Sequence, residues 1–125
     1  MLGRCDVVPF VPTTNPERAR LFYERTLGLR LVEDGPFALV FDANGVRLRV
    51  TKVESFVPAA YTVLGWVVRD ILATVEALGR AGVVCERYPG LAQDDAGVWT
   101  SPSGARVAWF KDPDGNVLSL TQAED

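Results

Sequence analysis

The sequence predicts an α+β protein built from two βαβββ modules whose mixed β-sheets form a cupped cleft. Three observations support this fold class. The chain has 125 residues, 48% of them hydrophobic, which is enough for one compact domain or two small halves. The order of predicted elements is strand, helix and three strands, and it occurs twice. A nine-residue hairpin segment, 42–50, also aligns without a gap with segment 112–120.

The first module is predicted over about residues 4–53. A strand at 7–11 precedes a helix that Asn15 caps and Pro16 opens, and Gly28 ends this helix. Strands are expected at 29–32, 37–41 and 46–52, and an Asn44-Gly45 turn joins the last two. A linker at about 54–60, which contains Pro58, follows.

The second module is predicted over about residues 61–122 and follows the same order. A strand at 62–68 leads to a helix that Asp70 caps and that ends before Gly82. Strands are expected near 83–87, 97–100, 106–110 and 116–121, with a turn at 112–115. The alternative is a generic α+β domain whose internal similarity is accidental, because turns of the D-x-x-G type are common.

Composition restricts the function. The net charge of −3 disfavours nucleic acid or an anionic membrane surface as a partner. The first residues lack an apolar signal core, and no apolar run approaches the roughly 20 residues that span a bilayer. We therefore expect a cytoplasmic protein in which Cys5 and Cys85 are reduced thiols. The chain has no histidine, which removes the commonest general base and the commonest transition-metal ligand.

Two motifs make the chain resemble the vicinal-oxygen-chelate superfamily, which includes glyoxalases, bleomycin-resistance proteins and dioxygenases. Residues 22–29, FYERTLGL, resemble the F-Y-x-x-x-L-G-[FL] signature of the first module in that family. Residues 112–116, DPDGN, resemble a turn near its C-terminus. The resemblance covers about residues 4–122 and implies a homodimer whose paired modules hold a ligand and, in the enzymes, a metal.

The resemblance places the four metal-ligand positions of those enzymes on Val8, Arg49, Leu64 and Ser119. Val8 and Leu64 are counted from the helix caps, so the neighbouring positions are alternatives for both. Divalent metals need imidazole, carboxylate or thiolate ligands, and a guanidinium repels a cation. We therefore expect no metal, no cofactor, and no metal-dependent glyoxalase or dioxygenase activity.

Strand alternation predicts what lines the cleft. The side chains expected there are apolar or aromatic, with two arginines and a hydroxyl: Val8, Phe10, Arg47, Arg49, Leu64, Trp66, Trp99 and Ser119. Apolar walls with sparse polar groups are typical of a small-molecule site. The first hypothesis is thus a protein that binds a planar or anionic organic molecule and has no assigned catalytic residue.

Several alternatives remain. The chain could be a metal-independent or atypical enzyme of the lyase or dioxygenase type, or an accessory dimerisation module with a vestigial cleft. The arginines of the fourth strand could face solvent, and the tryptophans could belong to the core or to a dimer interface.

Overall fold

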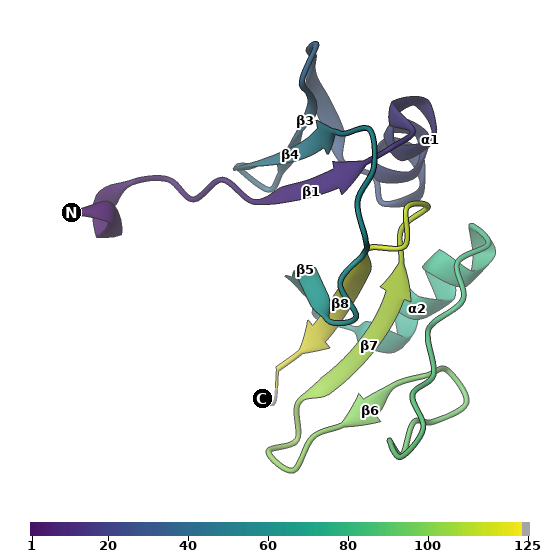
Figure 1. The fold of residues 1–125 in the computed structure, drawn as a ribbon. Coiled ribbons are helices and arrows are strands. Elements are labelled where there is room, and N and C mark those ends of the chain that lie inside the picture. Colours follow the sequence, from purple (N-terminus) through teal and green to yellow (C-terminus); the bar gives the residue numbers. More distant parts are fainter. Residues whose placement is uncertain (124–125) are drawn as a thin grey trace. The chain divides into compact units, whose positions relative to one another are not determined.

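The computed structural model describes residues 1–123, which form two compact units, Met1–Pro58 and a second that begins at Ala59. Each unit is a four-stranded mixed sheet with a helix (Figure 1). The boundary between the units lies within the segment 54–60. In the part of the chain described, no helix is long and apolar enough to cross a lipid bilayer.

The first unit has strand order β1-β4-β3-β2. Strand β1 runs parallel to β4, and the other neighbours are antiparallel. A short 3-10 turn, Leu2–Arg4, precedes β1, and a π-helical turn, Phe22–Thr26, extends α1. The elements are β1 Phe10–Thr13, α1 Pro16–Leu21, β2 Arg30–Asp34, β3 Ala38–Ala43 and β4 Val46–Lys52.

Local sequence explains where these elements begin and end. The Asn15 side chain accepts a hydrogen bond from the backbone N–H of Arg18 at 3.2 Å, and Pro16 follows at the first helical position. Gly28 has φ +77°, a left-handed conformation that glycine adopts without strain at a helix end. Asn44 and Gly45 also have positive φ, as the tight turn between β3 and β4 requires.

The second unit repeats this topology, with strand order β5-β8-β7-β6 and β5 parallel to β8. The Asp70 carboxylate accepts from the backbone N–H of Ala73 at 3.1 Å and so caps the helix, as Asn15 does in the first unit. The duplicated βαβββ fold predicted from the sequence is therefore confirmed. The elements are β5 Thr62–Val67, α2 Ile71–Arg80, β6 Trp99–Thr100, β7 Arg106–Lys111 and β8 Val117–Gln122.

The strand predicted at 83–87 is absent. The backbone N–H of Glu86 donates to the carbonyl of Trp109 at 2.7 Å, but no ladder of such bonds follows. Instead, the Gln93 side chain donates to the carbonyls of Glu86 and Gly97 and accepts from the backbone N–H of Tyr88. One amide side chain thus satisfies backbone groups that a paired strand would have satisfied, and the segment stays irregular.

Each sheet buries one face against its helix. In the first unit Phe41, Leu48 and Val50 are fully buried on that face, and the Phe41 ring lies 5.7 Å from the ring of Tyr23. In the second unit Phe110 and Leu118 are fully buried on the face that α2 covers. The opposite side of each sheet is called its open face below.

Candidate functional site

The open face of the first unit carries the arginines that the sequence singled out. Side chains of residues directly opposite each other on neighbouring strands point to the same side of a sheet. Arg49 pairs with Phe10 on β1 and with Val40 on β3. Because Val50 is buried on the helix-covered face, Arg49 and Phe10 lie on the open face, together with Arg47 and Thr51.

Arg49 and Phe10 also contact each other. The Arg49 guanidinium carbon lies 5.9 Å from the centre of the Phe10 ring, within the range of a cation–π interaction. The ring remains 60% exposed, whereas Arg49 is half-buried. This contact orients the guanidinium over an apolar surface and leaves its N–H groups available to an anionic group.

The placement of Val8 in the first strand was wrong. The strand β1 begins at Phe10, and Val8 lies before it in an irregular, largely exposed segment. The backbone N–H of Arg49 bonds to the carbonyl of Pro9, so pairing with β4 starts two residues later than expected. Phe10, and not Val8, is the residue opposite Arg49.

The open face of the second unit is organised around Ser119. Ser119 on β8 pairs with Gly65 on β5 and with Trp109 on β7. Trp99 reaches the same face because it pairs with Val107, which lies two residues from Trp109 on β7. Ser119 and Trp99 thus share a face, as the sequence predicted.

The placement of Leu64 and Trp66 on this face was also wrong. Leu64 pairs with Leu118, and Trp66 pairs with Leu120, so both side chains point toward the helix-covered face. The register between β5 and β8 shifts between Thr62 and Leu64. Gly65 lies five residues before the Asp70 cap, as Phe10 lies five before the Asn15 cap, so Gly65 and not Leu64 is the residue opposite Ser119.

Three aromatic side chains gather beside Ser119. The Trp109 ring lies 6.2 Å from the Trp99 ring and 5.4 Å from the Tyr88 ring, the latter in an edge-to-face arrangement. Burial is the main cause that raises the pKa of Tyr88 above its usual value, so this hydroxyl is protonated at neutral pH. Alternation did not find Tyr88, because it lies in the irregular segment before β6.

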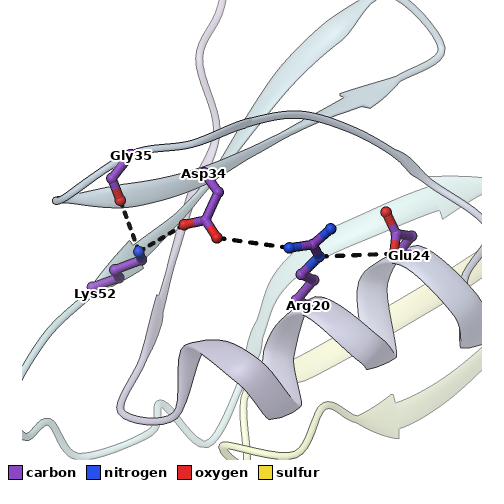
Figure 2. A network of polar contacts seen from close by, with 5 residues as sticks. All are labelled: Arg20, Glu24, Asp34, Gly35 and Lys52. Carbon is purple, nitrogen blue, oxygen red and sulfur yellow. Dashed lines mark hydrogen bonds and ion pairs between the residues drawn. The ribbon is translucent and has the colours of Figure 1, made fainter.

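A hollow of about 530 Å³ lies in the first unit beside the start of α1. Three of the charged side chains that line it, Arg20, Asp34 and Lys52, are joined in one network, as Figure 2 shows. The Lys52 ammonium donates to the Asp34 carboxylate at 2.9 Å and to the Gly35 carbonyl at 2.7 Å. Arg20 approaches the other Asp34 oxygen at 3.7 Å and Glu24 at 3.8 Å.

This network joins the ends of β2 and β4 to α1. The hydrogen bond from Lys52 is the main cause that holds the pKa of Asp34 below its ordinary value. Within this network the cations and carboxylates neutralise each other, so Arg20, Asp34 and Lys52 offer no unmatched charge to a ligand. We interpret the network as a structural connection in the first unit.

Paired βαβββ modules, each with an open sheet face, define the class of protein. The family model of the glyoxalase/bleomycin resistance protein/dioxygenase superfamily matches residues 6–120. The chain belongs to this superfamily. A comparison with curated proteins found no match.

Solved structures with the same fold have diverse sequences. A superfamily member from Sphaerobacter thermophilus is 24% identical, with a TM-score of 0.75 over 94% of this chain and 96% of that one. A glyoxalase/bleomycin resistance protein/dioxygenase from Alicyclobacillus acidocaldarius is 18% identical, with a TM-score of 0.74 over 98% and 93%. The fosfomycin resistance protein FosX from Listeria monocytogenes is 12% identical, with a TM-score of 0.75 over 94% and 92%. At these identities the likeness concerns the fold.

The residues at the corrected positions do not suit the metal that enzymes of this superfamily carry. Phe10 lies opposite Arg49 within the first sheet, and Gly65 lies opposite Ser119 within the second. This set offers one neutral hydroxyl and one fixed positive charge, whereas a divalent metal needs imidazole, carboxylate or thiolate ligands. Among residues 1–123, no three Cys, Asp or Glu side chains come together as a metal-binding group.

Proposed function

We propose that the open sheet faces bind small organic ligands without a divalent metal: a planar molecule on the second unit and an anionic group on the first. The observation that carries the proposal is the aromatic cluster of Tyr88, Trp99 and Trp109 beside Ser119. Aromatic walls with a few polar groups are typical of sites that bind drug-sized molecules. No residue is assigned a catalytic role.

The aromatic cluster supports a planar ligand. Trp99 and Trp109 are tilted by 35° to each other and remain partly exposed. Buried core tryptophans normally lose this exposure, whereas these two present ring surface on the open face. When the flat ring of a ligand stacks on such a surface, the apolar area of that ring is removed from water.

On the open face of the first unit, Arg49 supports the binding of an anionic group. Ion pairs with carboxylates hold Arg20, Arg30 and Arg80, but no such ion pair involves Arg49 within residues 1–123. A guanidinium that forms no ion pair with a carboxylate offers several N–H donors in a planar fork. This geometry suits a carboxylate or a phosphate of a ligand. The carboxylates of Glu24, Asp34 and Asp42 have partners of their own in the same unit.

Two further features belong to the proposal. Both cysteines are free, Cys5 exposed and Cys85 partly buried, which is the state expected in the reducing cytoplasm. We also propose a homodimer, since Phe10, Val67 and Tyr61 are large and strongly exposed, and a partner surface would remove their apolar area from water. Sedimentation velocity at micromolar concentration tests the dimer, and a monomer there would contradict it.

The test of the ligand proposal uses 2-naphthoate, a planar carboxylate, titrated calorimetrically into the full chain. Binding is expected for the wild type and about fivefold weaker for Trp99→Leu, because stacking on the indole is lost. Trp66→Leu is the matched control, since Trp66 points to the helix-covered face. If the wild type does not bind 2-naphthoate, or the two variants lose affinity equally, the proposal fails.

A further inference from the structure

The open face of the first unit carries a hydroxyl group that has no partner within residues 1–123. We propose that the Thr51 hydroxyl donates a hydrogen bond to the anionic group that Arg49 binds, so that two side chains of β4 hold one carboxylate. This inference rests on the anion binding proposed above for the first unit and deepens it. It adds to the guanidinium a second, uncharged donor.

The Thr51 hydroxyl is buried and unpaired. Its Oγ1 atom forms no hydrogen bond within residues 1–123, although the residue as a whole is only half-buried. A buried hydroxyl without a partner is unfavourable, and most such groups are satisfied in native proteins. Valine has nearly the same shape and no hydroxyl to desolvate, so a side chain that only filled this space would not need one. An acceptor atom of a ligand supplies the missing partner.

Strand β4 places Thr51 and Arg49 next to each other on the open face. They are two residues apart in the strand, so their side chains point to the same side and their Cα atoms are separated by roughly 6.6 Å. Their register partners on β3, Ala38 and Val40, are apolar and are 2% and 8% exposed. The two donors thus lie beside an apolar surface whose side chains offer no competing acceptor.

Rotation about one bond brings the hydroxyl to a ligand. The side chain projects to the open face, and a change of χ1 moves Oγ1 between staggered positions there. The exposed surface of Thr51 belongs to atoms other than Oγ1, because that oxygen is buried. A rotation that turns the hydroxyl toward a carboxylate therefore replaces an unpaired buried donor by a paired one, which favours the bound state.

The charges of this face favour an anion. The register places three cations and two carboxylates on it, an excess of one positive charge: Arg30, Arg47 and Arg49 against Glu33 and Asp42. Asp42 is paired with Arg30 at 3.3 Å. The Glu33 carboxylate lies against Gly35, in the turn between β2 and β3. The Arg49 guanidinium therefore remains available to the carboxylate of a ligand, and Arg47 adds a second positive charge beside it.

The test compares 2-naphthoate with 2-acetonaphthone, which has nearly the same shape and no charge. NMR titration of the full chain follows the backbone amide signals of the first unit, so the affinity of this face is measured separately from that of the second unit. Thr51→Val should weaken 2-naphthoate binding roughly tenfold, the effect of losing a hydrogen bond to a charged group. The affinity for 2-acetonaphthone should change less, because a hydrogen bond to a neutral oxygen is weaker.

A second measurement separates a role in binding from a role in folding. Because the hydroxyl has no partner in the chain itself, Thr51→Val should raise the midpoint of urea unfolding while it weakens 2-naphthoate binding. Thr51→Ser keeps the hydroxyl and should retain most of the affinity. Thr62→Val is the matched control, since Thr62 is an exposed threonine of β5 in the second unit, and it should leave the affinity of the first unit unchanged.

The outcomes separate the two proposals. The role of Thr51 would be overturned, with anion binding by Arg49 left intact, if Thr51→Val bound 2-naphthoate as tightly as the wild type or lowered the urea midpoint. An equal loss of affinity in Thr51→Ser and Thr51→Val would also overturn it. If 2-naphthoate shifted no amide signal of the first unit in the wild type, anion binding and this inference would fall together.

Discussion

Arg49 places its guanidinium over the ring of Phe10, its register partner on the neighbouring parallel strand, with 5.9 Å between the guanidinium carbon and the ring centre. In the second unit the equivalent pair is Ser119 with Gly65. The same topology thus presents a cation beside a ring on one sheet and a hydroxyl packed over a glycine on the other. Neither pair supplies metal ligands.

Removal of the Arg49 charge should weaken the binding of an anion specifically. Arg49→Ala is expected to lower the affinity for 2-naphthoate roughly tenfold, the effect of losing a charge-assisted hydrogen bond. Its affinity for the neutral 2-acetonaphthone should change much less. Arg80→Ala is the control, because Arg80 pairs with Glu76 on the surface of α2. Calorimetric titration measures both ligands, and an equal loss for the two would remove Arg49 from anion binding.

The Asp34 network should make the stability of the first unit depend on pH. The pKa of Asp34 is below its ordinary value of 3.8 in the folded state, chiefly through the hydrogen bond from Lys52. Ionised Asp34 therefore stabilises the fold above pH 3.8, and this contribution disappears as the pH falls through the lower folded pKa.

Asp34→Asn should accordingly lower the urea midpoint at pH 7, and its difference from the wild type should shrink as the pH falls below 3.8. Glu76→Gln serves as the control, since Glu76 contacts Arg80 in an exposed i,i+4 pair worth little. A pH-independent difference between Asp34→Asn and the wild type would contradict the role of ionisation.

Two phenylalanines that lie four residues apart should differ sharply in their effect on stability. Phe41 is fully buried against Tyr23, so Phe41→Ala should cost about 3 to 5 kcal/mol of unfolding free energy. Phe37 is 76% exposed, and Phe37→Ala should change stability by less than about 0.5 kcal/mol. Urea unfolding followed by circular dichroism measures both, and similar costs would show that the helix-covered core is misplaced.

The Asp70 cap should stabilise α2 through its acceptor oxygen. Asp70→Ala removes the bond to the backbone N–H of Ala73 and is expected to cost about 1 kcal/mol. Asp70→Asn keeps an acceptor and should retain most of the stability. If the asparagine variant lost as much as the alanine variant in chemical unfolding, the hydrogen bond would not be the source of the effect.

Local signals in the sequence predicted most of the fold. Caps, positive-φ glycines and the Asn44-Gly45 turn act over a few residues, so the helices and hairpins were found with bounds shifted by three residues or fewer. The strand expected at 83–87 is absent, because the Gln93 side chain donates hydrogen bonds to the carbonyls of Glu86 and Gly97. The pattern of residues 83–87 does not reveal these bonds, since they come from a side chain outside that segment.

The candidate site was predicted less well, since it depends on register. The register of the sheets puts Phe10 on one face with Arg49, and Ser119 on one face with Trp99; that these residues bind a ligand stays a prediction. Alternation misplaced Leu64 and Trp66, because the count back from the Asp70 cap was off by one residue, and an error of one reverses the face of every side chain in the strand. The equal spacing of Phe10 from Asn15 and of Gly65 from Asp70, five residues in each case, was the signal that could have corrected the count.

The central claim is that the open faces bind an organic molecule by stacking and hydrogen bonding instead of through a metal. The most direct measurement is the affinity of the full chain for 2-naphthoate, determined once after treatment with a chelator and once with Zn²⁺, Mn²⁺ or Ni²⁺ added. Neither Arg49 with Phe10 nor Ser119 with Gly65 offers ligands that hold a divalent metal, so equal affinities are expected under all these conditions. Binding that appears only when a metal is supplied, together with one tightly held metal ion per chain, would contradict the account.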